Sequence, residues 1–427
     1  MKINFLEIFS AESILLCLTL ILLLPIAVLL VECLAALLPD RKSVKSRVAQ
    51  NDTRPTVTVL IAAHNEEAVI GGTIATILPQ LSDRDKLIVI ADNCSDLTAS
   101  IARDRKAIVL ERKNTQQKGK GYALDYGLQS IQHEPSDVVV ILDADCRIEP
   151  NYIKSVAKMA MASQRPVQPI NLLYRADRLD LKSAVSEFAF VVKNLVRPKG
   201  LARLNLPCMV TMGTAFPWSI INKVSLASDN LVEDMQFGID LAIAGNAPLF
   251  CSDAKVTGVL PLRNRAATTQ RTRWEHGHLS TLKTQVPRLI SESWRQKRMD
   301  LLAIASDLSV PPLSFLVILW VMVAMVGLMV VFAEGQLNTA ICWIAIEGLL
   351  LLMSILLAWA KFGRKIIPLK SLVSIPLYIL WKIPIYFQFL VKPQQQWIRT
   401  ERDVVQTPFI TRGSVKRTQV AELAYKE

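Results

Sequence analysis

The sequence predicts an α/β domain with a mostly parallel sheet, carried between apolar segments at both ends of the chain. Three observations lead to this prediction. Short apolar, β-branched runs alternate with helix-compatible stretches between residues 56 and 142. Polar and acidic residues collect where those runs end. Hydrophobic residues make up 51% of the chain, and their excess lies in the first 40 residues and between Leu308 and Val391.

The first strand is predicted at Thr56–Ala63, a continuous apolar run that is followed by the polar residues "HNEE". A run without alternation is typical of a strand that is buried on both faces, as in parallel sheets. Three further runs follow this pattern, the last of them more weakly: Leu87–Ala91, Val138–Leu142 and Ala107–Leu110. The helix-compatible stretches between the runs are Glu67–Leu81, Asp96–Arg105 and Lys120–Gln132. Because strands and helices alternate, we expect a ligand at the carboxyl ends of the strands.

The N-terminal apolar segment runs from Ala11 to Leu38, and a helix needs about 20 apolar residues to cross a bilayer. A signal peptide would instead have a basic start and a core of about 7–15 residues. Here the basic residues follow the core: Arg41, Lys42, Lys45 and Arg47. Since basic flanks stay in the cytoplasm, we expect the N-terminus outside and the following domain inside, at a bacterial inner membrane.

Two further spans are predicted at about Leu308–Phe332 and Leu337–Trp359. The next apolar stretch, residues 371–391, contains Lys382 and two prolines, so we expect a re-entrant or interfacial hairpin there. Glu347 lies in the middle of the third span, where an ionisable group is costly. It should therefore face protein or a polar cavity, either bonded to a neighbouring helix or serving a substrate path.

The charge distribution indicates what the chain binds, and the cysteines indicate the compartment that its α/β domain faces. The net charge of +12 arises largely beside the apolar segments, which favours the lipid bilayer and not nucleic acid as the partner. The seven cysteines are scattered, as in a reduced domain that faces the cytosol. The expected layout is an anchor at 1–40, a basic linker at 41–55, the α/β domain at 56–285, an interfacial amphipathic segment at 286–307, a membrane region at 308–391 and a basic cytoplasmic tail at 392–427.

Acidic side chains at a predicted strand end point to metal-assisted chemistry. Asp143 and Asp145 stand where the fourth strand stops, and a spacing of two puts both on one side of an extended chain. Carboxylates and a pyrophosphate are the hard oxygen ligands that Mg²⁺ or Mn²⁺ prefers. The plainer alternative is that the two acids cap or turn the loop. No GxGxxG and no Walker lysine motif is present, so the commonest nucleotide signatures are absent.

A second group of candidates lies further along the chain. Glu233 and Asp234 precede a helix-like run, so they either cap that helix or supply a base that deprotonates an acceptor hydroxyl. In the segment "TTQRTRWEHGH", Arg273 can clamp phosphate and Trp274 offers a flat face to a sugar ring. The alternative for this segment is an amphipathic stretch that lies on the membrane.

These elements, in this order, resemble the family 2 glycosyltransferases of the membrane-embedded, cellulose synthase-like kind. The matching motifs are the strand followed by "AHNEE", then "ADNCSD", "KGKGYAL", "DAD", "VED" and "QRTRW". Each is modest alone, and together they cover roughly Thr56–Trp274. The resemblance implies a GT-A fold and an inverting transfer from a nucleotide diphosphate sugar, typically a UDP-sugar.

The resemblance also implies a role for each matching residue. The residues that bind the nucleotide sugar would be Asn65, Glu67, Asp92, Lys120 and Asp143, and Asp145 would bind the metal. Asp234 would be the catalytic base. The residues around the acceptor and the diphosphate would be Gly213, Thr214, Glu233, Gln270, Arg273 and Trp274.

The implied acceptor is a lipid-linked or growing glycan in polysaccharide assembly. A monofunctional glycolipid synthase of the ceramide glucosyltransferase-like type is the alternative, because such enzymes share the order of motifs. Cys146 after the acidic pair and the small membrane region both depart from processive relatives. The intact acids disfavour a non-catalytic scaffold, and the large soluble insert disfavours a transporter.

Overall fold

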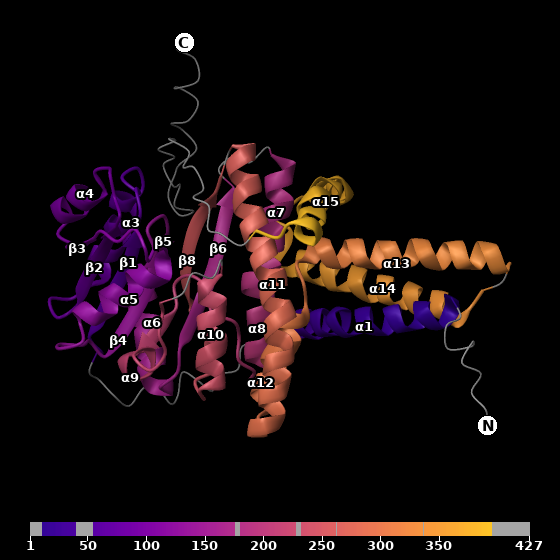
Figure 1. Cartoon of the computed structure of the whole chain (residues 1–427), viewed down its shortest axis with the longest axis horizontal. Helices are drawn as coiled ribbons and strands as arrows, with labels where there is room; N and C mark the ends of the chain where they lie inside the picture. The colour runs from indigo at the N-terminus through magenta and orange to yellow at the C-terminus, as the bar shows by residue number, and fades with distance from the viewer. Residues whose placement is uncertain are drawn as a thin grey trace, which may run out of the picture.

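The computed structural model describes residues 11–39, 54–175, 180–227, 232–261, 263–335 and 337–394. The basic residues expected at 41–47 and the tail after residue 394 lie outside this part of the chain. Figure 1 shows a layered α/β unit on one side and a rod of apolar helices on the other, with the long helix α11 (Asn264–Gln296) standing between them.

The described part of the chain holds an eight-stranded mixed sheet in the order β3-β2-β1-β4-β7-β6-β8-β5. Six of its strands share one direction, while β7 runs antiparallel to β4 and β6, and β5 runs antiparallel to β8. The strands are β1 (Val57–Ala63), β2 (Lys86–Asp92), β3 (Ile108–Arg112), β4 (Val138–Asp143), β5 (Arg147–Ile148), β6 (Val167–Arg175), β7 (Ala215–Pro217) and β8 (Leu249–Leu260). The prediction of a mostly parallel sheet is therefore confirmed.

Apolar layers cover both faces of the sheet. Val57, Val59 and Ile61 of β1 belong to one buried cluster, while Leu60 belongs to another on the opposite face, as the period of two requires. The helices that pack on or beside the sheet are α3 (Ile70–Ile77), the 3-10 turn Leu78–Gln80, α4 (Thr98–Asp104), α5 (Lys120–Ser130), α6 (Tyr152–Ser163), α9 (Trp218–Ile221) and α10 (Glu233–Ile243). Because the strands are buried on both faces, only their ends are open to a ligand.

A continuous helical segment connects the sheet to the apolar rod. It consists of α7 (Leu181–Val191), a π-helical turn (Val192–Val196) and α8 (Arg197–Arg203). Such π-helical turns are rare and are often found at functional sites. After α11, the short helix α12 (Met299–Ser309) packs back on α10 through a shared apolar cluster. The expected boundary at residue 285 therefore falls inside α11.

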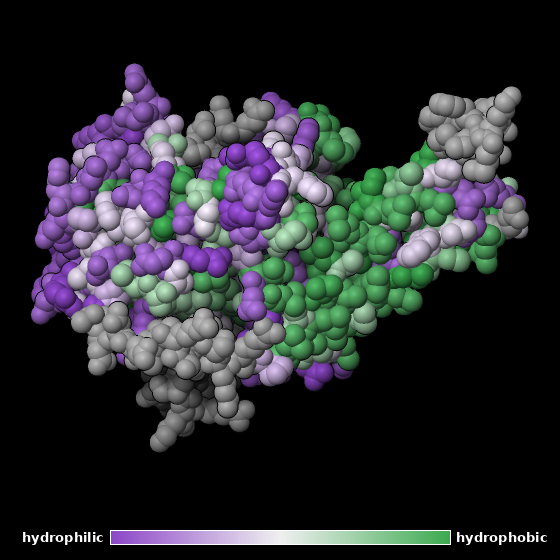
Figure 2. All heavy atoms as spheres, turned by 90° about the horizontal axis from the view of Figure 1, so that it is seen from below, coloured by the Kyte–Doolittle hydropathy of each residue, from purple (hydrophilic) through white to green (hydrophobic). Residues whose placement is uncertain are grey.

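The rod consists of α1 (Ala11–Ala36), α13 (Leu313–Glu334) and α14 (Thr339–Ala358), which continues into a π-helical turn (Trp359–Gly363). These helices lie side by side (Figure 1) and share one buried apolar cluster. Figure 2 shows a broad hydrophobic surface over them and a hydrophilic surface over the α/β unit. Among the described residues, four helices are long and apolar enough to cross a membrane, namely these three and the C-terminal segment Leu369–Val391.

That C-terminal segment is one helix and not the hairpin expected from its prolines. A 3-10 turn (Leu369–Ser374) leads into α15 (Ile375–Val391). Pro376 falls in the first helical turn, where a missing N–H costs nothing, and Pro384 is accommodated inside the helix. The helix lies at the end of the rod that meets the α/β unit and contacts α7, α11 and α13 (Figure 1).

Glu347 of α14 is completely buried among the helices of the rod, so it faces protein as expected. Neither oxygen of its carboxylate has a hydrogen-bond partner in the described part of the chain. The expected bond to a neighbouring helix is therefore not present. The seven cysteines form no disulfide with one another.

Candidate active site

A cavity of about 920 Å³ opens at the carboxyl ends of β1, β2 and β4 and continues towards the apolar helices. Its sheet end is lined by residues that follow the strands. Its other end is lined by Leu29 of α1, by the link between α12 and α13, and by Lys382 of α15. One continuous space therefore connects the edge of the sheet with the base of the rod.

The end of β2 contributes Asp92, whose carboxylate is already engaged. Arg112 at the end of β3 forms a buried ion pair with it at 2.6 Å and also donates to the carbonyl oxygen of Gln117 at 2.8 Å. Nδ1 of His64 lies 2.7 Å from the carbonyl oxygen of Asp92. Asp92 and His64 both line the cavity. Arg112 was not predicted from the sequence, because an arginine at the end of a weak strand carries no motif.

Two of the predicted nucleotide-sugar residues lie beside the cavity and not in its lining. Asn65 has a positive φ of 54°, and its Oδ1 accepts a hydrogen bond from the backbone N–H of Ser95 at 2.8 Å. Glu67 accepts one from the backbone N–H of Leu97 at 3.0 Å. Both side chains therefore hold the turn after β2, and their role in nucleotide binding stays a prediction.

Acidic residues and a lysine meet at the centre of the cavity. Nζ of Lys120, the first residue of α5, lies 2.7 Å from Oδ1 of Asp143 and 3.6 Å from Oε1 of Glu233. Burial alone would lower the pKa of Lys120, but the carboxylates of Asp143, Glu233 and Asp234 raise it above the ordinary lysine value. The lysine is therefore charged and joins the end of β4 to the start of α10.

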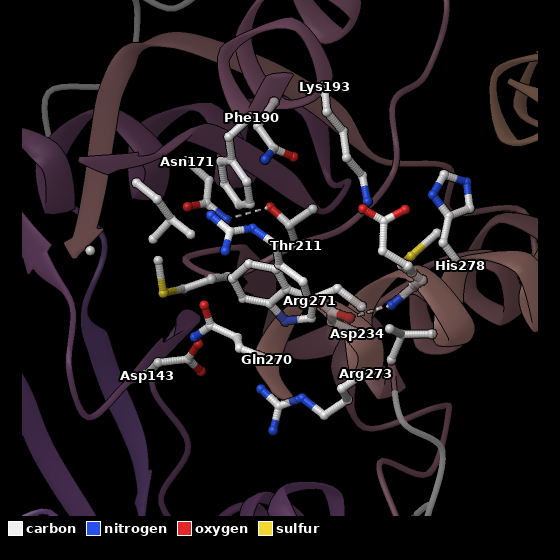
Figure 3. A pocket seen from close by; sticks show the side chains of 18 of the residues that line it. Asp143, Asn171, Phe190, Lys193, Thr211, Asp234, Gln270, Arg271, Arg273 and His278 are labelled. Atoms are coloured by element: carbon white, nitrogen blue, oxygen red, sulfur yellow. Dashed lines mark hydrogen bonds between the residues drawn. The ribbon is translucent and has the colours of Figure 1, made fainter. Parts of the chain in front are cut away.

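Asp234 lies in the first turn of α10 and lines the cavity next to Glu233. Its Oδ1 accepts a hydrogen bond from the N–H of Met235 at 2.9 Å (Figure 3). Burial is the main cause that raises the pKa of Asp234, with Lys120 opposing the shift and Asp143 adding to it. Burial likewise raises the pKa of Glu233. A carboxylate with a raised pKa is a stronger base than an ordinary aspartate.

The helix α11 supplies Gln270, Arg273 and Trp274, all of which line the cavity as predicted. In Figure 3, Gln270 and Arg273 lie on the same side of the cavity as Asp143. The indole of Trp274 packs against Phe190 with ring centroids 5.7 Å apart. The segment "QRTRW" is therefore a cavity wall and not a surface stretch.

Gly213 and Thr214 do not line the cavity. Gly213 has φ of +89°, and a Cβ there would lie 2.8 Å from the hydroxyl of Tyr152, which donates to the Gly213 carbonyl. The hydroxyl of Thr214 donates to Oε1 of Gln168 at 2.5 Å and is almost fully buried. These two residues shape the wall from behind, and the neighbouring Thr211 and Met212 face the cavity in their place.

The residues present are suitable for a divalent cation. Asp143 and Asp145 both line the cavity and present carboxylate oxygens, the ligand type that Mg²⁺ and Mn²⁺ prefer. Within the described ranges, no group of three or more His, Cys, Asp or Glu side chains is arranged to hold a metal ion by itself. A cation held here would thus need further oxygen ligands from a bound molecule, which a diphosphate supplies. Both ring nitrogens of His276 are already engaged by backbone groups of Ile385 and Gln394.

The mostly parallel sheet and the cavity at its carboxyl edge, with acids, a lysine and an arginine in its lining, agree with the glycosyltransferase class that the sequence motifs predict. The family model "Glycosyltransferase like family 2" matches residues 55–277, which are 223 of the 427 residues of the chain. The chain belongs to this family. The family and the sheet topology confirm the prediction of a GT-A-type glycosyltransferase fold.

The relatives match only part of the chain. A low-salt glycan biosynthesis hexosyltransferase of Haloferax volcanii is 32% identical over 126 residues, which are 27% of this chain and 29% of that protein. A 4,4'-diaponeurosporenoate glycosyltransferase of Staphylococcus haemolyticus is 27% identical over 135 residues, 30% of this chain and 35% of that protein. The solved mannosyltransferase of Pyrobaculum calidifontis, in complex with GDP-Man and Mn²⁺, is 18% identical, covers 82% of this chain and 100% of its own, and has a TM-score of 0.49.

Proposed function

We propose that this chain is an inverting, metal-dependent membrane glycosyltransferase that moves a sugar from a nucleotide diphosphate sugar to an amphiphilic acceptor. One observation carries the proposal. A single cavity is lined at one end by the acidic residues of the α/β unit and at the other by residues of α1, α13 and α15. Such a space brings a water-soluble donor and a membrane-held acceptor together.

The donor would occupy the sheet end of the cavity, with its diphosphate near Asp143 and Asp145. These two residues would hold Mg²⁺ or Mn²⁺, and the bound cation would neutralise the negative charge that develops on the leaving diphosphate. Arg273 and Gln270 would donate hydrogen bonds to the same leaving group, because a guanidinium matches phosphate oxygens in pairs. A UDP-sugar remains our expectation for the donor.

Inversion follows from a single displacement. Asp234 would accept the proton of the acceptor hydroxyl while the acceptor oxygen forms a bond to the anomeric carbon. The bond between that carbon and the diphosphate breaks at the same time, and the nucleoside diphosphate leaves with the electron pair. No covalent intermediate with the chain is needed, since general base catalysis and stabilisation of the leaving group suffice. Trp274 would support the sugar ring with its indole face.

The acceptor would reach the cavity from the membrane. Its apolar part would lie against the helices of the rod, and its hydroxyl would lie near Asp234. A lipid-linked glycan in polysaccharide assembly meets this requirement, and so does the alternative, a simple glycolipid precursor. Leu29 and Leu313, which line this end of the cavity, support an acceptor with an apolar chain in both cases. The α/β unit would face the cytoplasm of the cell, where nucleotide sugars are made.

The experiment that tests this function is an incubation of membranes containing the chain with radiolabelled UDP-sugars and GDP-sugars, with and without a chelator. Label in a solvent-extractable lipid supports transfer to an amphiphile, whereas label only in high-mass polymer supports glycan extension. Asp234→Asn is the matched control, because it replaces one carboxylate oxygen by an amide nitrogen at nearly the same shape and removes the base. Equal transfer by the Asp234→Asn variant would refute the assignment of the active site.

A further inference from the structure

We propose that the membrane-facing end of the cavity binds the anionic head group of an apolar acceptor, a phosphate or a carboxylate carried on a lipid chain. This inference rests on the proposed function, because it specifies the acceptor of the same site. The residues that define the head-group pocket are two cations, Lys193 and Arg271, and three polar residues around them, Asn171, Asn194 and His278.

Neither cation of the head-group pocket forms an ion pair with a carboxylate of the described residues, although Asp234, Glu275 and Asp307 are near enough to act on the charge of Lys193. Lys193 lies in the π-helical turn after α7, and its ammonium has no hydrogen-bond or ion-pair partner within the described ranges. The guanidinium of Arg271, on α11, is buried; it donates to the hydroxyl of Ser186 at 3.2 Å and lies 5.3 Å from the ring of Trp381. No carboxylate of the described residues pairs with it. Lys193 is half-buried and Arg271 is buried. A buried charge without a paired carboxylate is costly, so we expect a ligand to supply the anion that Arg271 lacks.

Two other buried cations that lie near the cavity have carboxylate partners, unlike Lys193 and Arg271. Arg112 is paired with Asp92. Arg197 is paired with Glu32 at 2.6 Å and with Asp307 at 2.5 Å. The arginines that stabilise the fold thus have carboxylate partners. Lys193 and Arg271 line the cavity without such an ion pair.

Three polar atoms of the head-group pocket are also without partners in the described part of the chain. They are Oδ1 of Asn171, Nδ2 of Asn194 and Nε2 of His278, in side chains that are 5%, 5% and 4% exposed. Burial, together with Lys193, lowers the pKa of His278 well below the ordinary histidine value, so its ring is neutral. Buried polar atoms are normally satisfied. The anionic oxygens of a head group would accept hydrogen bonds from the donor atoms of the pocket, and its hydroxyl would donate one to an acceptor atom.

The head-group pocket is separate from the expected position of the diphosphate. In Figure 3, Asn171, Thr211, Lys193 and His278 lie on one side of Asp234, and Asp143, Gln270 and Arg273 lie on the other. The apolar residues Val310 and Leu313 line the same cavity next to α12 and α13. An anionic head in this pocket would therefore have its apolar chain against the rod and its reacting hydroxyl near the base.

The test uses the full-length chain in a neutral detergent with three probes that share one alkyl chain: hexadecyl phosphate, hexadecanoate and hexadecanol. Inorganic phosphate is the fourth probe. Binding is followed by quenching of tryptophan fluorescence, to which Trp274 in the cavity wall contributes. We expect the two anionic amphiphiles to bind at least about 10-fold more tightly than the alcohol, because hydrogen bonds to a charged group are strong. Inorganic phosphate should bind at least about 10-fold more weakly than hexadecyl phosphate, since it lacks the apolar chain.

Two variants localise this preference. Lys193→Met and Arg271→Met should each reduce it to about threefold or less, while binding of a nucleoside diphosphate, measured by calorimetry, stays the same. Lys283→Met is the matched control, because Lys283 is an exposed lysine of α11 outside the cavity. Lys193→Met should melt at the same temperature as the original chain or higher, since a half-buried charge that forms no ion pair is removed. A lysine with a merely structural role would give a lower melting temperature and an unchanged preference.

Equal binding of the alcohol and the two anions would overturn the proposal, as would a preference that Lys193→Met leaves intact. Inorganic phosphate that binds as tightly as hexadecyl phosphate would rule out a lipid as the source of the anion. Loss of nucleotide binding in Lys193→Met would assign this lysine to the donor and also overturn the inference. If the original chain binds no nucleoside diphosphate at all, the proposed function fails instead, and the preference among the lipids is still measurable.

Discussion

Lys120 and Asp143 form an ion pair at 2.7 Å that joins the first residue of α5 to the last residue of β4. The other side of the ammonium faces Glu233 at 3.6 Å. A single cation thus holds together acids from two stretches of chain that are almost a hundred residues apart. The arrangement places Lys120 where a diphosphate and its metal would meet the protein.

Lys120→Met should therefore weaken donor binding. Removal of the ammonium leaves Asp143 and Glu233 facing each other and takes away a charged hydrogen-bond donor for the diphosphate. We expect the KM for the nucleotide sugar to rise about 10- to 100-fold, the range for loss of one hydrogen bond to a charged group. Lys113→Met, at an exposed lysine outside the cavity, is the control. An unchanged KM in Lys120→Met would contradict the donor assignment.

Asp234→Asn should lower kcat by about 10²- to 10⁴-fold, the usual contribution of a positioned base, and should leave nucleotide binding intact. The pH dependence follows from the same residue. Burial raises the pKa of Asp234, and a protonated carboxyl cannot accept the proton, so activity should fall on acidification at a pH above the ordinary aspartate value. A profile of kcat/KM against pH measures this limb. An acid limb at the ordinary value would indicate another base.

Divalent metal should be required for transfer. Asp145→Asn removes one of the two carboxylates that we propose as metal ligands. Loss of a residue that only orients a metal ligand already lowers metal affinity by about 10- to 100-fold. We therefore expect the Mn²⁺ concentration for half-maximal activity to rise at least about 10-fold, measured by titration after treatment with a chelator. Asp253→Asn, at an exposed acid outside the cavity, should behave like the original chain. Full activity in the presence of chelator would exclude the metal assignment.

The sheet was predictable from the sequence where each strand is a continuous apolar run. Val57–Ala63 and Val138–Asp143 are buried on both faces, and such runs need no knowledge of the partner strand. The short strand β7 was not predictable, because Ala215–Pro217 joins the sheet only through pairing with β4 and β6. Pairing between distant segments leaves no local pattern.

The sequence predicted some residues of the candidate site and missed others. Asp143, Asp234 and Arg273 stand in recognisable motifs, and the structure brings them to one cavity. Lys193 and Asn194 were missed because they belong to an apolar helical run with no motif of their own. Their place in the cavity depends on how α7 and α8 pack between the sheet and the rod. A lone lysine inside an apolar run was the only signal available.

The attachment of α15 to α11 gives a prediction about stability. Lys382 of α15 forms a buried ion pair with Glu275 of α11, and the hydroxyl of Tyr386 donates to the same carboxylate at 2.8 Å. Lys382→Met should destabilise the protein by about 3–5 kcal/mol, because one buried charge loses its partner. The double variant Glu275→Gln with Lys382→Met should recover much of this loss. Unfolding in detergent measures both, and equal stability of the single and double variants would contradict the coupling.

The contact between α1 and α8 gives a last prediction, which concerns how the rod is held on the catalytic unit. Gly200 of α8 lies so close to α1 that a Cβ built on it would be 2.0 Å from the carbonyl oxygen of Glu32. The same contact is secured by the buried ion pair between Glu32 and Arg197, one turn earlier in α8. Gly200→Ala should therefore separate the two helices and weaken this pair.

We expect Gly200→Ala to lower the free energy of unfolding by about 1–3 kcal/mol or more, as overpacking does when backbone atoms must move. Gly71→Ala is the matched control, because Gly71 lies in helix α3 and its Cβ would make ordinary contacts beginning at 3.4 Å. Alanine at that position should be neutral or stabilising, since glycine is a poor helix former. Because α1 also lines the cavity through Leu29, Gly200→Ala should raise the KM for the acceptor more than the KM for the donor. A variant that unfolds and reacts like the original chain would show that α1 is not fixed to α8 in the way this contact requires.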